Sequence, residues 1–355
     1  MNEIIRPLNI RPKMSVNEMV LEMKKSGCFG AGRLAEATDI YEKMLNDDGC
    51  RIFLGLSGAM TPAGMKGVIS ALLQANAIDA IVSTGANLVH DALEAFGGHH
   101  VKGKCQVDDR ELYKTGVYRI YDIFVPEWNY VKWFDLPVLK FYKEIQDMPK
   151  ITTPELFRLL AEHLEQSVSD KSLLGESVIY NAYKADIPIF APAITDSCFG
   201  IISWGVNKWK QDFIKAGCSR EEVDALRGAH PKIDVYQDLK EFFQIVEGSK
   251  NTAAVILGGG VPKNFIFQAG NELKKPLKYV IQITMDRPEP GGLSGATLEE
   301  AISWGKVAAE NETHTTVISD ITICFPLIAA AILERIELGK INIQKRKQSL
   351  PTTLL

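Results

Sequence analysis

Four short segments rich in glycine, serine and threonine could bind a phosphate-bearing ligand. Each directly follows an apolar run: residues 55–62 (GLSGAMTP), 83–87 (STGAN), 194–200 (ITDSCFG) and 258–262 (GGGVP). Glycine lets backbone N–H groups approach a phosphate, and a helix N-terminus favours the negative charge. Together the four segments predict a dinucleotide site. None of them matches GxGxxG, and residues 258–260 taken alone could equally form a tight turn.

Three aspartates lie near the ends of such runs. Asp196, Asp286 and Asp320 could hold the hydroxyls of a ribose or a cation. Each could equally cap a helix or stabilise a turn, so both interpretations stay open for each residue.

Lys306 is the candidate for covalent chemistry. It closes the run Ser-Trp-Gly-Lys, which follows Glu299 and Glu300. A lysine must be neutral to attack carbon, and its reference pKa near 10.4 leaves less than about 0.1% neutral at pH 7. Burial beside the indole of Trp304 would lower that pKa and make an imine-forming nucleophile. Most lysines that follow a helix are solvated instead, and the local sequence alone favours this alternative.

The histidines and cysteines form no metal-binding motif. His99 and His100 precede Asp108 and Asp109, but no HxH, HExxH or CxxC spacing accompanies them. We therefore expect a loop and no metal. The six scattered cysteines are expected to be free thiols in a reducing cytosol.

Short apolar runs predict the strands that position these residues: 51–57, 77–84, 187–195, 252–257, 279–284 and 315–319. Helical patterns lie between them at 62–76, 153–166, 237–247 and 325–338, and the aromatic-rich residues 128–141 are expected to be core. Such alternation predicts an α/β fold, a single large Rossmann-like domain whose parallel sheet is flanked by helices. Ligands of such sheets collect at the carboxyl ends of the strands.

Composition narrows the class of protein. The chain has 355 residues, 46% hydrophobic and 24% charged, with a net charge of −4. These values are typical of a globular protein and argue weakly against a nucleic-acid partner. The N-terminus lacks the apolar core of a secretory signal, and residues 321–333 are too short to span a membrane, so we expect a cytoplasmic protein with no membrane partner. The predicted organisation is an N-terminal helical extension (1–48, with two helices in 15–48 broken at 27–32), the α/β domain (49–339) and a basic, polar tail (340–355).

Several segments resemble the deoxyhypusine synthase family. The run SGATLEEAISWGKV (294–307) is similar to its active-site signature, whose catalytic lysine closes SWGK. FLGLSGAMTPAG (53–64) and TGANLVHD (84–91) lie where the family has its first and second NAD loops. IPIFAPAITDSCFG (187–200), LGGGVPKN (257–264) and TVISDITICFPL (316–327) resemble its later loops, in the same order. The resemblance covers about residues 15–338.

The resemblance implies an NAD-dependent aminobutyl transferase. In this family NAD takes a hydride from spermidine, 1,3-diaminopropane leaves, and the butylimine passes through the active-site lysine to an acceptor. The acceptor is a lysine of the hypusine-containing translation factor, or putrescine in the related homospermidine synthases. The family is typically a homotetramer, and its N-terminal helix, for which residues 15–27 are the candidate here, can cover a neighbour's pocket.

Roles for individual residues follow from the same resemblance. Lys306 would be the imine-forming nucleophile, Trp304 would shield the aminobutyl chain, and Glu300 would pair with an amine. The residues expected to contact NAD are Ser57, Gly58, Ala59, Met60, Thr61, Thr84, Gly85, Asp196, Gly259, Asp286, Asp320 and Ile321. Asp286 is included because it lies near the end of an apolar run. The expected substrate contacts are His90, Asn264, Gly291, Gly292, Glu300 and Trp304.

The sequence departs from the family at substrate positions. His90 and Ile201 stand where the family has acids, Asn264 replaces a histidine, and Leu293 replaces an aspartate. Each buried ammonium of a polyamine needs a carboxylate or several acceptors. The departures therefore predict retained chemistry with altered amine recognition, or a branch that holds spermidine with other groups such as Asp91 or Glu289. Two alternatives stay open: a non-catalytic NAD- or polyamine-binding homologue, and an NAD-dependent amine oxidoreductase.

Overall fold

The computed structural model describes residues 4–206, 209–310 and 313–349. The chain forms two compact units. Unit 1 comprises Met1–Ser57, Ala71–Ser83 and Leu239–Leu355, and unit 2 comprises Gly58–Ser70 and Thr84–Asp238. The predicted α/β domain, 49–339, includes parts of both units.

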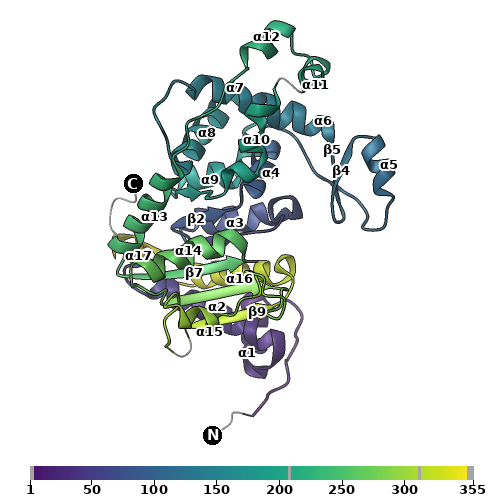
Figure 1. Ribbon diagram of the computed structural model, residues 1–355. Coiled ribbons are helices and arrows are strands. Elements are labelled where there is room, and N and C mark those ends of the chain that lie inside the picture. The colour runs from purple at the N-terminus through teal and green to yellow at the C-terminus, as the bar shows by residue number, and fades with distance from the viewer. Residues whose placement is uncertain (1–3, 207–208, 311–312, 350–355) are drawn as a thin grey trace. The chain divides into compact units, whose positions relative to one another are not determined.

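Unit 1 is built on parallel strands in the order β2-β1-β7-β8-β9 (Figure 1). Its elements are α1 (Val16–Ser26), α2 (Phe29–Asn46), β1 (Cys50–Leu56), β2 (Ala80–Ser83), β7 (Asn251–Leu257), α14 (Gly260–Glu272), β8 (Tyr279–Thr284), α15 (Leu298–Ser303), β9 (His314–Ile318), α16 (Ile321–Glu337) and α17 (Ile343–Ser349). Every residue of β1 and β8 is buried, as a sheet covered on both faces requires. In Figure 1, α14 lies on one face, and α2 and α16 on the other.

Register brings the ends of these strands together. Leu56 of β1 pairs with Leu257 of β7, and Leu257 pairs with Ile283 of β8. The predicted strand 279–284 has the same bounds as β8, and the predictions at 51–57, 252–257 and 315–319 are each within about one residue of β1, β7 and β9. The α/β fold class is therefore confirmed.

The N-terminal helices are part of unit 1. A capping box joins Ser15 and Glu18 at the start of α1, and Gly27, with φ +65°, ends it. The Ser15 hydroxyl donates to Glu334 of α16 over 2.8 Å, and Arg335 of the same helix donates to Asn17 over 2.8 Å. The two predicted helices are present, and they pack on α16 instead of extending from the unit.

The C-terminal tail also differs from the polar appendage that its composition predicts. Its helix α17 carries Arg346, whose side chain is 2% exposed. The Arg346 guanidinium donates to Asp79 and to the carbonyl of Asn76, over 3.0 Å in the latter case. Arg51 lies 3.6 Å from the same aspartate. A buried carboxylate requires such partners, and this requirement fixes the tail.

Unit 2 is mostly helical. Its elements are α4 (Gly85–Ala95), β3 (Val101–Lys102), α5 (Asp109–Lys114), β4 (Val117–Ile120), β5 (Ile123–Pro126), α6 (Glu127–Tyr130), α7 (Leu136–Ile145), α8 (Thr153–Ser167), α9 (Val178–Lys184), β6 (Ile189–Phe190), α10 (Cys198–Gly205), α11 (Lys210–Lys215) and α12 (Arg220–Ala225). Helices α3 (Lys66–Gln74) and α13 (Val235–Gly248) begin in unit 2 and end in unit 1. β3, β5 and β4 form a small antiparallel sheet.

Two features of unit 2 refine the sequence expectations. In the aromatic segment, Phe134 and Phe141 are buried as expected, but Trp128 is half exposed. β6 covers two residues of the predicted strand 187–195, because the chain turns at Ala191. Over the described residues, no helix combines the length and apolarity that a membrane crossing needs.

Candidate active site

The predicted site residues are divided between the two units. Unit 1 carries Ser57, Gly259, Asn264, Asp286, Gly291, Gly292, Glu300, Trp304, Lys306, Asp320 and Ile321. Unit 2 carries Gly58, Ala59, Met60, Thr61, Thr84, Gly85, His90 and Asp196.

In unit 1 the triple-glycine segment forms a cradle after β7. Gly258 and Gly260 have φ of +83° and +56°, a region that favours glycine. A Cβ on Gly259 would lie 2.4 Å from the Cα of Ser294, so no other residue fits there. The Ser57 hydroxyl donates to the carbonyl of Gly259, and this bond joins the ends of β1 and β7.

Gln282 and Lys263 connect this cradle to the loop at 293–296. The amide nitrogen of Gln282 donates to the carbonyls of Gly258 (2.9 Å) and Ser294 (2.7 Å). The Lys263 ammonium donates to the Gln282 side-chain oxygen over 3.0 Å and to the carbonyl of Ala296. These contacts fix the loop that leads into α15.

The run SWGK is the C-terminal cap of α15. Gly305 has φ +67°, its N–H donates to Ile302 over 2.9 Å, and the N–H of Lys306 donates to Ala301 over 3.0 Å. This pair of bonds is a Schellman motif, in which glycine takes the left-handed position. The Lys306 carbonyl accepts from Leu277, which precedes β8, over 3.0 Å. The backbone of Lys306 is thus held on both sides.

The side chain of Lys306 lies over Trp304. Its Nζ is 5.2 Å from the ring centroid, within the range of a cation–π contact. The indole itself is 61% exposed, and Lys306 is partly exposed. Glu300, at the N-terminus of α15, is exposed, and its N–H donates to the hydroxyl of Thr297.

Lys263 is a functional candidate that the sequence analysis missed. It is 2% exposed, and burial lowers its pKa to about 8. Glu300 acts in the opposite direction, and the charge of Lys306 lowers the pKa further. The charge of Lys306 therefore acts on a buried lysine head group. The sequence signal that could have identified Lys263 is its position directly before Asn264, in an otherwise apolar stretch after the glycines at 258–260.

Asp320 and Asp286 of unit 1 make the helix-cap and turn contacts that the sequence left open for them. Asp320 caps α16 by accepting from the N–H of Thr322 over 2.7 Å. Asp286 accepts from the N–H of Arg287 over 3.1 Å in an exposed turn, and it lines a cavity of about 370 Å³ with Gln282 and His314. Either carboxylate still has lone pairs for a ribose.

The remaining predicted residues of unit 1 lie in turns or at helix starts. Gly291 has φ +72° and donates to Pro288 over 3.0 Å, and the carbonyl of Gly292 accepts from two N–H groups of the 295–296 turn. Asn264 is half-buried in the first turns of α14, and Ile321 is the first residue of α16.

In unit 2, Asn87 ties two predicted cofactor loops together. Its side-chain oxygen accepts from the N–H groups of Met60 (3.0 Å) and Thr61 (3.2 Å), and its amide donates to the Thr84 hydroxyl (3.1 Å). A Cβ on Gly85 would lie 2.4 Å from the Ser197 hydroxyl, so the segment that contains the exposed Asp196 approaches the same place. Gly58 and Ala59 complete this turn. Asn87 was not predicted, although it is part of TGAN.

His90 is buried and joined to other rings. Its Nδ1 lies 2.9 Å from His100 Nε2 and 3.4 Å from the Tyr130 hydroxyl. Burial first, and then the neighbouring His100, lower the pKa of His90 to about 4, so it is neutral at physiological pH. His100 in turn binds Glu94 over 2.7 Å. In the described part of the chain, no group of three or more metal-ligating side chains gathers, and all six cysteines are free thiols.

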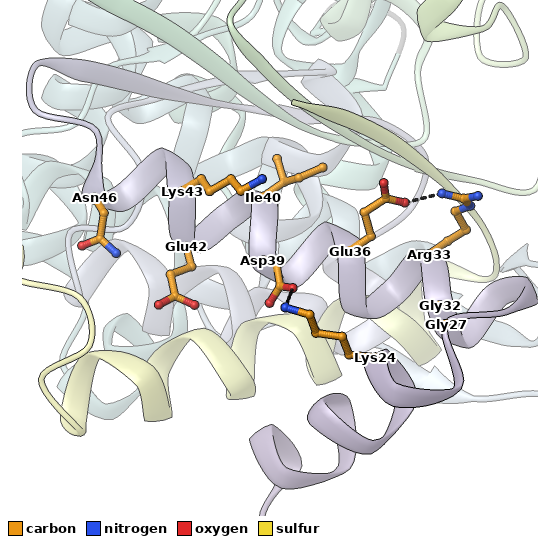
Figure 2. A pocket seen from close by; sticks show the side chains of 10 residues that line it. All are labelled: Lys24, Gly27, Gly32, Arg33, Glu36, Asp39, Ile40, Glu42, Lys43 and Asn46. Atoms are coloured by element: carbon orange, nitrogen blue, oxygen red, sulfur yellow. Dashed lines mark hydrogen bonds and ion pairs between the residues drawn. The ribbon is translucent and has the colours of Figure 1, made fainter. Parts of the chain in front are cut away.

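A cavity of about 830 Å³ beside α1 and α2 contains none of the predicted residues (Figure 2). Figure 2 shows Lys24 reaching Asp39, over 2.6 Å, and Arg33 reaching Glu36. Asp39 also pairs with Arg335 over 3.0 Å. These charges are compensated by one another, so the cavity lacks a free charge that would select a ligand.

Comparisons with known proteins show which family the chain resembles over most of its length. The family model described as deoxyhypusine synthase matches residues 18–332. A Methanosarcina acetivorans protein named "Probable deoxyhypusine synthase 1" is 39% identical over 94% of this chain and 95% of its own length. The "Probable deoxyhypusine synthase" of Methanothermobacter thermautotrophicus is 34% identical over 94% and 98%. A crystal structure of "a putative deoxyhypusine synthase from Entamoeba histolytica" covers 93% of this chain and 97% of its own with a TM-score of 0.61, at 19% identity.

These matches define an α/β transferase that moves an aminobutyl group. The chain belongs to the deoxyhypusine synthase family. The family resemblance of the sequence is therefore confirmed.

Proposed function

We propose that this protein is an NAD-dependent transferase that moves the 4-aminobutyl group of spermidine through an imine on Lys306 to an acceptor amine. The placement of Lys306 supports this proposal. Its backbone is held by hydrogen bonds on both sides, whereas its amine lies beside the exposed Trp304 and the residue is partly exposed. A nucleophile must be fixed in position and open to its substrate.

The predicted loops fit a dinucleotide. In unit 1, α14 begins at Gly260 directly after β7, and the first N–H groups of a helix can receive a phosphate. In unit 2, Asn87 holds the turn of Met60 and Thr61. We assign NAD binding to the twelve predicted residues from Ser57 to Ile321. Within unit 2, Asn87 orients the loops that carry Met60, Thr61 and Thr84. When bound, NAD would accept a hydride from the carbon beside a donor amine and return it after transfer.

The steps at Lys306 balance as exchanges of one imine for another. The neutral amine of Lys306 forms a bond to the imine carbon of the oxidised donor. The bond from that carbon to the donor nitrogen breaks, and 1,3-diaminopropane leaves with the proton. The acceptor amine then displaces Lys306 in the same way. Trp304 lies where it can cover the chain, and Glu300 can pair with an ammonium.

For the acceptor, we propose a lysine of the hypusine-containing translation factor, as the names of the relatives suggest. Putrescine is the second candidate, favoured by the non-acidic residues His90, Ile201, Asn264 and Leu293 at family substrate positions. We also propose that the protein is a cytoplasmic homotetramer. Light scattering of the purified protein would test the number of subunits.

Borohydride trapping tests the proposal. With spermidine and NAD together, the peptide that contains Lys306 should gain the mass of a reduced aminobutyl group, and either compound alone should give none. Lys306→Ala should abolish transfer, and Lys340→Ala serves as the matched control on an exposed lysine. Trapping without any transferred product would indicate a binding homologue. Net NADH accumulation would indicate an oxidoreductase, because a transferase returns its hydride.

A further inference from the structure

Four side chains of unit 2 form a continuous chain of hydrogen bonds. The Lys66 ammonium pairs with one carboxylate oxygen of Glu94, and the other oxygen lies 2.7 Å from His100 Nδ1. His100 Nε2 in turn lies 2.9 Å from His90 Nδ1. The two rings are enclosed, since His90 is 7% exposed and the His100 side chain 4%. At the other end, Lys66 also reaches the exposed carboxylate of Glu176 over 3.4 Å, which connects the chain to the surface.

The backbone of unit 2 holds these groups in place. His90 and Glu94 are four residues apart on α4, so they lie on the same face of the helix. The segment after α4 brings His100 into contact with both. Asn129 of α6 fixes this segment, because its side-chain amide donates to the carbonyl of His99 over 2.8 Å. The chain of hydrogen bonds therefore joins three separate segments of unit 2.

The two rings can share one extra proton but cannot hold two. A ring nitrogen that carries a proton donates a hydrogen bond, and one without a proton accepts. Because His100 Nε2 faces His90 Nδ1, two imidazolium rings would set two N–H groups against each other. Without the extra proton, His100 donates to Glu94 through Nδ1–H and accepts at Nε2 from the Nδ1–H of His90. The other nitrogen of His90, Nε2, is then an acceptor, and it makes no hydrogen bond with any described residue.

A proton that reaches His90 Nε2 can pass along this chain. As the new N–H bond forms at Nε2, the proton on Nδ1 moves to His100 Nε2. His90 is then neutral again, with its proton on the other nitrogen, and the positive charge lies on His100 beside the carboxylate of Glu94. The ring centroids are 4.9 Å apart, so the charge ends one full ring away from the nitrogen at which the proton entered.

The surroundings favour the charge on His100 over a charge on His90. Burial first, and then His100, lower the pKa of His90 to about 4, while Glu94 acts in the opposite direction. Burial would raise the pKa of Glu94, but its hydrogen bonds to His100 and Lys66 hold that pKa below its usual value. Glu94 is therefore an anion, and it is the natural partner of an imidazolium at His100.

Two further titratable groups beside His90 do not compete for the proton. The Tyr130 hydroxyl lies 3.4 Å from His90 Nδ1, and burial, followed by nearby charges, raises the pKa of this tyrosine, so it stays protonated. Asp91 follows His90 on α4, but its carboxylate accepts from the Ser177 hydroxyl and from two N–H groups at the start of α9.

We propose that His90, His100 and Glu94 are a proton relay, in which His90 Nε2 accepts the proton of an ammonium and His100 stores it as an imidazolium beside Glu94. An amine must lose its proton before it is oxidised, because its nitrogen lone pair forms the imine bond as the hydride leaves the neighbouring carbon. In that step the two electrons of the C–H bond leave with the hydride to the proposed dinucleotide, and the proton goes to the relay.

His90 is the catalytic residue of this relay, and His100 and Glu94 are positioning residues. Storage on the second ring keeps the new positive charge away from a cationic substrate, and the same path returns the proton to the product amine. The use of the relay in amine oxidation rests on the proposed function, whereas the proton transfer between the two rings does not.

Nitrogen NMR of the protein labelled with ¹⁵N-histidine tests the relay without any reaction. Across about pH 5 to 9, where histidines titrate, we expect His100 to become an imidazolium while His90 stays neutral and its proton moves from Nδ1 to Nε2. In His100→Gln the tautomer of His90 should no longer change with pH. His99→Gln, on the exposed neighbouring ring, is the matched control and should leave the change intact. A His90 tautomer that is fixed over this range, or a positively charged His90, would overturn the proposal.

Rapid mixing with spermidine and NAD tests whether the reaction uses the relay. Lys306→Ala is the parent, because oxidation of the amine is then not followed by transfer to the lysine. At pH 7, His100→Gln and Glu94→Gln should each slow NADH formation roughly 100-fold, the lower range for general acid–base catalysis, with spermidine affinity within about twofold. The rate should recover toward that of the parent near pH 10, where a free amine is largely deprotonated. His99→Gln should match the parent at every pH.

The outcomes separate the relay from the proposed function. Parent-like rates at pH 7 in both His100→Gln and Glu94→Gln would overturn the catalytic use of the relay. A loss of rate that is the same at every pH would also overturn it, because that result is expected of a purely structural role. If the parent forms no NADH at all, the oxidation of spermidine in the proposed function is refuted, and the tautomer of His90 decides the relay.

Discussion

Lys263 gives a prediction about stability whose sign follows from its surroundings. Burial lowers its pKa to about 8 in the folded protein, from the usual 10.5 of a lysine. Between these values the unfolded chain binds a proton that the folded chain has released, so stability rises as pH rises from about 8 to about 10.5. The difference of 2.5 units corresponds to an upper bound of about 3 kcal/mol, at about 1.36 kcal/mol per unit.

The perturbation is Lys263→Met, which removes the titrating group and preserves the length of the side chain. Three acceptors, on Gln282, Leu293 and Ala296, then lose their donor, so the variant should be less stable at every pH. The informative quantity is the change with pH. The free energy of unfolding of the wild type relative to Lys263→Met should grow by about 2 to 3 kcal/mol between pH 7.5 and 10.

Urea unfolding followed by fluorescence at several pH values measures this difference. Lys263→Arg supplies the matched comparison, since neither arginine nor methionine titrates in this range, and the difference between the two variants should stay constant. If the wild-type advantage over Lys263→Met is independent of pH, or falls as pH rises, the assignment of a buried, partly neutral Lys263 is wrong.

Two further substitutions test the cradle and the tail. Gly259→Ala should reduce NAD affinity by at least tenfold in a fluorescence titration, because its methyl group meets Ser294; an affinity unchanged from wild type would remove the cradle from the cofactor site. Arg346→Leu should lower the free energy of unfolding by about 2 to 4 kcal/mol, since breaking a buried ion pair costs about 3 to 5 kcal/mol and Asp79 keeps Arg51 as a partner. Asp79→Asn in the same chain should recover part of that loss, and additive effects of the two changes would contradict a direct pair.

The sheet of unit 1 was predictable from the sequence because its strands are buried on both faces. Continuous apolar runs ended by glycine, serine or aspartate located β1, β7 and β8 to within about a residue. Such runs report burial directly, which is a local property. The family motif then singled out Lys306. Its neighbour is the glycine Gly305 because the cap of α15 requires a left-handed conformation there.

The residues that the sequence did not reveal are buried polar groups with partners far along the chain. Asn87 contacts Met60, Gln282 contacts Gly258 and Ser294, and Arg346 contacts Asp79. No pattern of spacing predicts such pairs, because only the tertiary fold makes them neighbours. The chain passes between the two units inside helices α3 and α13 and after strands β1 and β2, and no local sequence pattern marks these points.

Gln282 has one further consequence. A single side-chain amide holds both the glycine cradle after β7 and the loop that leads to α15 and Lys306. A ligand that orders one loop therefore reduces the entropy that a second ligand must overcome at the other. Cofactor and amine should consequently bind with positive cooperativity, and thermodynamic linkage requires each to strengthen the other by the same factor. The enzyme with both cofactor and amine bound would then be favoured over the enzyme with only one of them. This preference would suppress the oxidation of an amine when no transfer can follow.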